Sequence, residues 1–413
     1  MRILQLSKKF PYPLKDGESI AVMNLSKALN KLGCQVTLLA MNTTKHFCDV
    51  SSVNGSFKHY ESSHYTEIDN TLKFKDAFLN LFSHESYHIS RFICPKFRNE
   101  LIRLLKENTY DIVQLETLYL APYIPIIRKY SKAQVAMRAH NVEHEIWERV
   151  TRNTKNVAKK VYLKYLTKKL KRYEINQLKN YDLLIAISEK DLNTFRKLGY
   201  KNKGIVTPIG LTTEEYLPNH ATYRNDISLS FIGSLDWMPN LEGLTWFLDN
   251  VWDKLLDKYP NLKLHVAGRN TPKTLINSRY KNVKVYGEVN DAKRFINGHT
   301  IMIVPLLSGS GMRAKILEGM ALGRVVMTTQ LGLEGINAKH KQEVLVANTA
   351  QDFLEALDYC YQSNGSLIKI GKRAKKLADK KYDNLKTAQS LIREYNKVLK
   401  KEAKIKEDLA FAS

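Results

Sequence analysis

Two series of short, β-branched runs, each followed by a loop and a helical pattern, constrain the fold of this chain more than any other feature. In the first half the runs are Arg2–Ser7, Gln35–Ala40, Asp111–Leu115, Gln134–Ala139 and Asp182–Ile187. In the second half they are Leu229–Gly233, Lys263–Ala267, Val283–Tyr286, Ile301–Val304, Val325–Thr328 and Val344–Ala347. Because the runs are almost continuously apolar, they suit parallel strands covered by helices on both faces. The sequence therefore predicts an α/β protein with two doubly wound domains.

The domain boundaries follow from interruptions of this pattern. A chain of 413 residues exceeds one ordinary core, and Thr207-Pro208-Ile209-Gly210 supplies a bend between units. We predict domains over residues 1–206 and 207–385, and a C-terminal helix with a frayed tail over 386–413. The apolar face of that helix can dock on either domain, including the N-terminal one. Residues 46–90 either carry acceptor specificity or form an irregular insertion.

Composition and charge narrow the class of protein. No apolar run approaches the roughly 18 residues that cross a bilayer, and the first residues lack a secretory signal, so we expect a cytoplasmic protein. The four cysteines are isolated, which suggests neither a disulfide framework nor a zinc site. The net charge of +24 attracts polyanions, either nucleic acid or an anionic membrane face.

A glycine-rich turn between a strand and a helix is the main candidate site. The predicted strand Ile301–Val304 is followed by a loop and by Gly309–Gly311, directly before an apolar helical pattern. Glycines let the backbone approach a ligand closely, and free N–H groups at a helix start favour a phosphate. Arg313 and Lys315 oppose the helix dipole there, and a bound diphosphate would explain them. Glu318 is placed to accept hydrogen bonds from ribose hydroxyls.

A plainer interpretation of the same segment exists. On that interpretation Gly309–Gly311 is just a turn in the chain, and Lys315 and Glu318 are a surface pair that contributes about 0.2–0.5 kcal/mol. A bare GxG favours that interpretation. The combination of turn, helix start, two cations and carboxylate favours the anion site.

The segment Gly309-Ser310-Gly311-Met312-Arg313-Ala314-Lys315-Ile316-Leu317-Glu318 closely resembles the donor-binding motif of family 4 glycosyltransferases. The resemblance implies the GT-B fold, in which an acceptor-side and a donor-binding Rossmann-like domain face across a cleft. Asp16-Gly17 is similar to the family's N-terminal glycine loop, and Phe231-Ile232-Gly233-Ser234 to the first strand of its donor domain. The resemblance implies donor-binding roles for these residues: Gly17, Gly233, Ser234, Gly287, Val289, Gly309, Ser310, Gly311, Met312 and Glu318.

Two departures from the family pattern matter. Many members carry two glutamates seven residues apart, whereas here the earlier position is Ser310 and the later one is Glu318. The usual Arg and Lys after the first donor-domain strand are also missing. The pattern resembles a subgroup with the signature GSGMRxKILE, and our hypothesis is that Arg313 and Lys315 neutralise the diphosphate instead.

Polar residues follow the predicted strand Gln134–Ala139 in the first domain. Ligands of open α/β sheets collect at the carboxyl edge of the strands, and His140, Asn141 and Glu143 lie there in the sequence. By resemblance, His140 matches a histidine that reaches the donor sugar or its phosphate, and Asn141 and Glu143 are acceptor-side or cleft candidates. The alternatives are a loop histidine satisfied by its neighbours, or an incidental pair with His144. No third ligand with metal-binding spacing stands out.

The stretch from Arg152 to Lys179 is strongly basic, with Glu174 as its single acid and apolar residues at helical spacing. Such a stretch suits the surface of an anionic membrane, although its apolar stripe also has to pack on the sheet. We expect the stretch both to pack on the sheet and to contact the membrane. A peripheral position at the inner membrane face would fit a lipid-linked acceptor.

The predicted reaction moves a sugar from a nucleoside diphosphate sugar to a hydroxyl of a saccharide or lipid-linked acceptor, with retained anomeric configuration, in bacterial surface polysaccharide or glycoconjugate assembly. His140, Arg313 and Lys315 are the predicted catalytic residues. We expect no cofactor and no metal, since no acidic DxD lies at a strand end. One alternative is a sugar-nucleotide epimerase, which would turn over donor without acceptor. Another is a nucleic-acid-binding protein, but no specific reading motif is recognisable.

Overall fold

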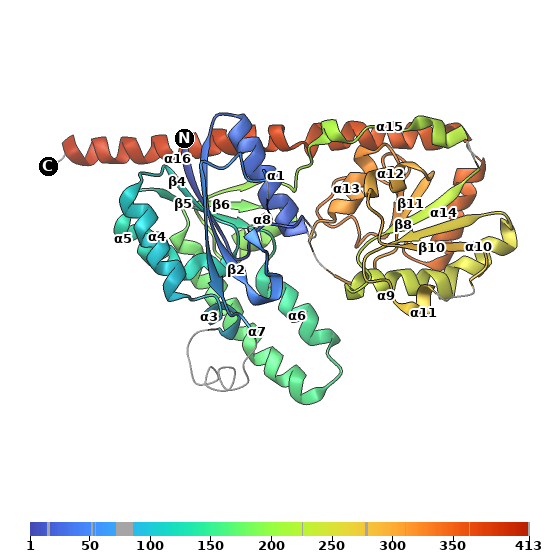
Figure 1. Cartoon of the computed structure of the whole chain (residues 1–413), viewed down its shortest axis with the longest axis horizontal. Helices are drawn as coiled ribbons and strands as arrows, with labels where there is room; N and C mark the ends of the chain where they lie inside the picture. The colour runs from blue at the N-terminus through green and yellow to red at the C-terminus, as the bar shows by residue number, and fades with distance from the viewer. Residues whose placement is uncertain are drawn as a thin grey trace. The chain divides into compact units, whose positions relative to one another are not determined.

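The computed structural model describes residues 1–14, 17–50, 53, 55–71, 86–224, 226–276, 280–309, 311–362 and 364–411. The chain divides into two compact units (Figure 1). Unit 1 comprises Met1–Gly210 and Thr387–Ser413, and unit 2 comprises Leu211–Lys386. Each unit is built around its own parallel sheet with helices on both faces.

The sheet of unit 1 has the strand order β3-β2-β1-β4-β5-β6-β7, with every pair parallel. Its strands are β1 (Arg2–Ser7), β2 (Gln35–Thr43), β3 (Ser62–Ile68), β4 (Ile112–Leu115), β5 (Gln134–Ala139), β6 (Leu183–Ala186) and β7 (Lys203–Val206). The strand order reverses between β1 and β4. Ligands of doubly wound sheets bind at the carboxyl ends of the strands beside such a switch point.

Helices cover the apolar strands of unit 1. They are α1 (Gly17–Lys31), α3 (Tyr87–Ser90), α4 (Pro95–Glu107), α5 (Ile124–Tyr130), α6 (Glu143–Asn153), α7 (Val157–Gln177), α8 (Glu189–Lys197) and α16 (Asn384–Phe411). Short 3₁₀ turns are η1 (Thr44–His46), η4 (Leu118–Tyr123) and η5 (Leu178–Asn180). Leu4, Val113, Val135 and Leu184 are fully buried in the core between sheet and helices.

The sheet of unit 2 has the order β10-β9-β8-β11-β12-β13, again with parallel pairing. Its strands are β8 (Ser228–Ile232), β9 (Lys263–Ala267), β10 (Val283–Gly287), β11 (Ile301–Val304), β12 (Val325–Thr328) and β13 (Leu345–Val346). Its α-helices are α9 (Met238–Phe247), α10 (Asp253–Lys258), α11 (Lys273–Ile276), α12 (Ala292–Asn297), α13 (Ala314–Ala321), α14 (Ala350–Gln362) and α15 (Asn364–Lys381). The turns η6 (Thr213–Glu215), η7 (His220–Arg224) and the π-helical η8 (Leu248–Trp252) complete it. The switch point lies between β8 and β11.

The predicted fold class is confirmed, and each run predicted as a strand overlaps one. Two strands were not predicted: β3, which lies within the unassigned residues 46–90, and β7. Along β3 the exposure of the side chains alternates, and β7 has four residues with no fully buried side chain. Both strands lie at the edges of the sheet, where polar and short segments are tolerated.

The junction between the units follows from backbone hydrogen bonds. Thr207 N donates to Ala186 O at 2.9 Å, and the side-chain amide of Asn24 donates to Gly210 O at 3.2 Å, so residues up to Gly210 stay with unit 1. Leu211 N donates instead to Tyr382 O at 2.7 Å, which ties it to unit 2.

The C-terminal helix α16 begins in unit 2 and continues in unit 1. Leu391 and Tyr395 have no exposed surface, so the apolar face of the helix is packed against unit 1.

Candidate active site

The turn between β11 and α13 has the backbone conformation that its glycines allow. Gly309 has a φ of +104° and Gly311 a φ of +81°, in the left-handed region that side chains disfavour. A Cβ at Gly309 would lie 3.0 Å from Nη2 of Arg313. Ser310 lies outside the described residues. The glycines therefore let the chain turn closely around the Arg313 side chain before the helix begins at Ala314.

Lys315, in the first turn of α13, reaches across to the end of β8. Its Nζ donates to Asn240 Oδ1 at 2.6 Å and to Ile232 O at 3.4 Å. A Cβ at Gly233 would lie 3.1 Å from this Nζ, so the glycine leaves room for the ammonium group. Burial and the neighbouring charge of Arg313 lower the pKa of Lys315 to about 7, against the opposing effect of Glu318.

Arg313 and Arg269 add two further cations at the carboxyl ends of the strands. Arg313 is 6% exposed, and its guanidinium carbon lies 5.7 Å from the ring centroid of Trp237. Arg269 follows the end of β9, and its Nη2 donates to Ser234 Oγ at 3.2 Å. Three basic side chains thus gather beside the switch point between β8 and β11, which makes this edge of the sheet electropositive.

Sequence reasoning missed Arg269, Asn240 and Trp237 at this site. Asn240 is buried in α9 and links Lys315 to the β8 loop, because its amide nitrogen also donates to Ser234 O at 2.8 Å. None of these three residues belongs to the glycine turn from which the site was predicted. A basic residue directly after Gly268, at the end of a predicted strand, was the available signal for Arg269.

Glu318 lies one helical turn after Lys315. The hydroxyl of Tyr216 donates to its Oε1 at 3.1 Å, and burial raises the pKa of this carboxyl. Met312 is 8% exposed, so its side chain packs into the protein. Of the residues singled out in unit 2, Gly233, Ser234, Gly309, Arg313 and Lys315 lie around the same strand ends.

The other donor-binding candidates lie further apart. Gly287 ends the edge strand β10 with a φ of +69°, and its carbonyl accepts a hydrogen bond from Gly268 N at 2.7 Å. Val289 follows in the loop and is half-buried. Gly17 belongs to unit 1, begins α1, and is exposed, and a Cβ there would meet no described atom within 4 Å.

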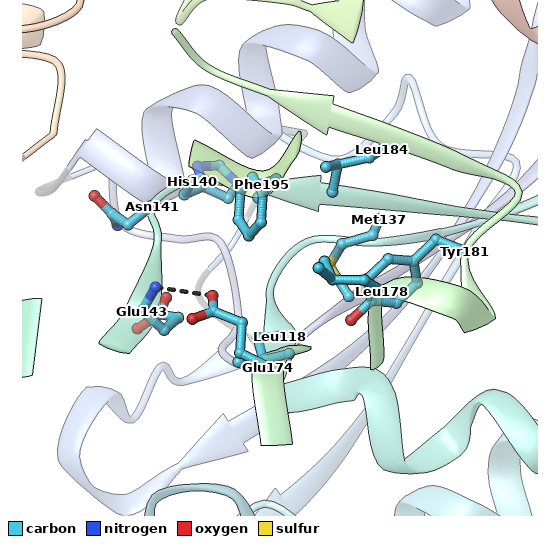
Figure 2. A pocket seen from close by; sticks show the side chains of 11 residues that line it. Leu118, Met137, His140, Asn141, Glu143, Glu174, Leu178, Tyr181, Leu184 and Phe195 are labelled. Atoms are coloured by element: carbon cyan, nitrogen blue, oxygen red, sulfur yellow. Dashed lines mark hydrogen bonds between the residues drawn. The ribbon is translucent and has the colours of Figure 1, made fainter. Parts of the chain in front are cut away.

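The candidates of unit 1 follow β5 and line a small cavity (Figure 2). Its volume of about 10 Å³ holds roughly one water molecule. The lining residues are Leu118, Met137, Ala139, His140, Asn141, Glu143, Glu174, Leu178, Tyr181, Leu184 and Phe195. His140 is 6% exposed, and its Nε2 lies 3.0 Å from Oε2 of Glu116 at the end of β4.

Glu143 and Glu174 form a second acidic group at this edge. Glu174 accepts hydrogen bonds from the backbone N–H of Glu143 at 3.0 Å and of His144 at 3.2 Å, so it caps the start of α6 (Figure 2). His144 Nδ1 also lies 2.5 Å from Glu174, so this histidine does not join His140. Burial and Glu174 raise the pKa of Glu143 to about 7, although Lys8 and a hydrogen bond from Tyr119 oppose the shift.

Within the described ranges, no group of three or more His, Cys, Asp or Glu side chains is arranged to hold a metal ion. Among the helices of this part of the chain, none is both long enough and apolar enough to cross a membrane.

Both halves of the chain match known protein families. Residues 16–215 match the family described as Glycosyltransferase Family 4, and residues 226–363 match Glycosyl transferases group 1. The chain belongs to glycosyltransferase family 4. It is therefore a nucleotide-sugar glycosyltransferase, and its two Rossmann-like units form a GT-B fold.

Individual relatives match this glycosyltransferase along nearly its whole length. An uncharacterized 44.6 kDa protein in the cps region of Klebsiella pneumoniae is 22% identical over 405 residues, which cover 95% of this chain and 99% of that protein. Sucrose-phosphate synthase from Thermosynechococcus elongatus has a TM-score of 0.70 at 14% identity, over 96% of this chain and 99% of its own. The Anabaena protein HepE in complex with UDP has a TM-score of 0.65 at 13% identity, over 96% and 100%.

Proposed function

We propose that this glycosyltransferase moves a sugar from a UDP-sugar to a hydroxyl of a saccharide or lipid-linked acceptor, with retention and without a metal ion. The observation that carries the proposal is the cation group at the strand ends of unit 2, in which Lys315 Nζ is held 2.6 Å from Asn240 Oδ1. Arg313 and Arg269 supply two more positive charges there. Clustered cations attract a polyanion, and a nucleoside diphosphate is one.

The same residues would stabilise the reaction as charge develops. As the bond between C1 of the sugar and the phosphate oxygen breaks, negative charge grows on the diphosphate. The prepositioned side chains of Arg313 and Lys315 and the N–H groups at the start of α13 would stabilise that charge. Attack by the hydroxyl from the same face forms the new bond to C1 and gives its proton to the departing phosphate oxygen. Glu318 would hold the ribose, and His140 would contact the transferred sugar.

UDP is the donor nucleotide to test first, because the HepE complexes contain UDP and UDP-glucose. The relative in a cps region supports a role in surface polysaccharide assembly. A thermal-shift screen of UDP-, GDP-, ADP- and TDP-sugars identifies the donor. Transfer to acceptor candidates with EDTA present, followed by NMR of the anomeric proton, then tests the metal requirement and the stereochemistry.

Arg313→Ala tests the site itself. We expect this substitution to lower turnover by about 10²–10³-fold, as removal of a charge-stabilising donor does elsewhere. Lys258→Ala is a matched control, because Lys258 pairs with Asp358 at 2.6 Å on the surface of unit 2, away from the strand ends. Turnover by Arg313→Ala at the control's rate would refute the assignment, and an inverted product would refute retention.

The helices α6 and α7 would bring the enzyme to an anionic membrane surface. They pack against each other as a hairpin that projects from the sheet of unit 1 (Figure 1). Val157 is 75% exposed and Val161 65% exposed in the first turns of α7. The surrounding exposed basic residues are Arg152, Lys155, Lys159, Lys160 and Lys164. Apolar side chains among cations suit the headgroup region of anionic lipid, beside which a lipid-linked acceptor would lie.

Vesicle co-sedimentation tests this placement. We expect binding to vesicles that contain phosphatidylglycerol but not to pure phosphatidylcholine, and weaker binding as salt rises from about 0.05 to about 0.5 M. Serine at both Val157 and Val161 should reduce binding several-fold. Leu217→Ser is the control, since Leu217 is 75% exposed in unit 2. Equal binding by the double variant and the wild type would contradict the proposed surface.

A further inference from the structure

Glu116, directly after β4 in unit 1, is a fully buried carboxylate that touches His140. Its Oε2 lies 3.0 Å from His140 Nε2 and 3.3 Å from Arg138 Nη1. Its Oε1 accepts hydrogen bonds from the side-chain amides of Gln5, at 2.5 Å, and Gln114. Side-chain donors from β1, β4 and β5 and from the residue that follows β5 therefore meet on one acid.

The buried acid is ionised in this setting. Burial opposes its charge, but Arg138 and the hydrogen bonds from His140 and Gln5 outweigh burial and lower the pKa of Glu116 to about 2. An ionised carboxylate can only accept hydrogen bonds. Nε2 of His140 must therefore carry the proton that bonds to Glu116.

A second layer of hydroxyl groups orients the two amides. Tyr60 donates its hydroxyl proton to Gln5 Oε1 at 3.0 Å, and Tyr395 donates to Gln114 Oε1 at 2.5 Å. With each amide oxygen engaged in this way, the amide nitrogens point to Glu116. Tyr395 lies on α16 and has no exposed surface, so the C-terminal helix forms part of the support beneath His140.

We propose that Glu116 is a positioning residue that fixes His140 in the tautomer protonated at Nε2. In that tautomer Nδ1 is a hydrogen-bond acceptor. An acceptor nitrogen pairs with a hydroxyl group and not with a fully ionised phosphate oxygen, so His140 would contact a sugar hydroxyl. The contact with a sugar hydroxyl rests on the proposed function. The tautomer of His140 does not depend on that function.

Nitrogen-15 NMR of histidine side chains in the full-length chain tests the tautomer directly. In the wild type we expect His140 with its proton on Nε2. In Glu116→Gln we expect a mixture of tautomers, turnover about 10–100-fold lower, and an unchanged Kd for UDP, because UDP lacks the sugar. Glu116→Asp keeps the buried negative charge near Arg138 but shortens the side chain by one methylene group, which draws the carboxylate away from His140. It should show the same NMR change if Glu116→Gln fails to fold.

Glu100→Gln is the matched control. Glu100 contacts another histidine, with its Oε1 3.1 Å from His64 Nδ1 on the surface of unit 1. This substitution should alter the His64 signal and leave the His140 signal and turnover unchanged.

Three outcomes would overturn the inference. The first is a wild-type His140 protonated at Nδ1, and the second is an unchanged His140 signal in both Glu116 variants. The third is an altered signal with wild-type turnover. A chain that turns over no nucleotide sugar but shows the expected tautomers would refute the proposed function and leave the positioning of His140 in place.

Discussion

Among the basic side chains at the strand ends of unit 2, Lys315 is the one whose charge should respond most to pH near neutrality. Its folded pKa, about 7, lies below the ordinary lysine value because of burial and Arg313. The ammonium form is therefore present below pH 7 and is lost as the pH rises above it. A diphosphate binds the ammonium form, so we expect the Kd for UDP to rise by up to about tenfold for each pH unit between about 7.5 and 9. Isothermal titration across that range measures the slope.

Lys315→Met separates this effect from other titrations. The variant should bind UDP more weakly at pH 7 and show little dependence on pH above it. Lys258→Met, on the surface of the same unit, should keep the wild-type slope. A pH-independent Kd in the wild type would show that Lys315 does not hold the diphosphate as an ammonium group.

The two cations of the GSGMRxKILE segment could be predicted from the sequence because they lie beside a glycine turn. The side chains that surround them in the fold could not be predicted. Asn240 is 75 residues away from Lys315 in the chain, and only the fold brings α9 and α13 close enough to place its Oδ1 2.6 Å from Lys315 Nζ. The same holds for Glu116, 24 residues from His140, which looks in the sequence like an ordinary acid at a strand end.

At the scale of elements, α13 packs against β11 and β12 through a glycine. A Cβ at Gly319 would lie 2.9 Å from both Met302 Sδ and Val326 Cγ2. We expect Gly319→Ala to lower the free energy of unfolding by about 1–3 kcal/mol, as overpacking of a core does. Because α13 carries Lys315 and Glu318, its displacement should also weaken UDP binding. Urea denaturation and titration of the same samples measure both effects.

Gly365→Ala on α15 is the control for the added methyl group. A Cβ there would meet no described atom within 4 Å, and alanine favours helix more than glycine does, by about 0.5–1 kcal/mol. This variant should be as stable as the wild type or slightly more so. Equal stability of the Gly319 and Gly365 variants would mean that α13 can move away from the sheet without penalty.

The predictability of the elements followed their burial. Strands such as β11, with four fully buried residues, were predicted to the residue. The edge strand β3 was missed because six of its seven residues keep some exposure, and its Ser62–Ile68 run reads as a polar loop. The hydrophobic pattern identifies a strand whose two faces are both covered by helices. It is weaker for a strand at the edge of the sheet.

At the scale of the whole molecule, the proposed nucleotide-binding residues and His140 belong to different units. Arg269, Arg313 and Lys315 belong to unit 2, which also has its own core around Phe231, Phe247 and other buried residues. Unit 1 contains His140 and Glu116. It also contains the chain after residue 386, where Tyr395 donates a hydrogen bond to Gln114. The sequence pattern predicted two domains, but the assignment of α16 depends on contacts that link residues 281 positions apart.

This division makes a prediction about isolated fragments. A fragment of residues 211–386 should fold cooperatively, because its sheet and core are complete, and it should bind UDP with a Kd within about tenfold of the full-length value. It should transfer no sugar, since His140 lies in the other unit.

A fragment of residues 1–210 should be less stable than one in which 387–411 are joined to it, because Leu391 and Tyr395 would no longer cover its core. Circular dichroism on heating and titration with UDP measure these differences. Loss of UDP binding in a folded 211–386 fragment would show that unit 1 contributes substantially to holding the nucleotide. In that case Lys315→Met in the same fragment would change its UDP binding little.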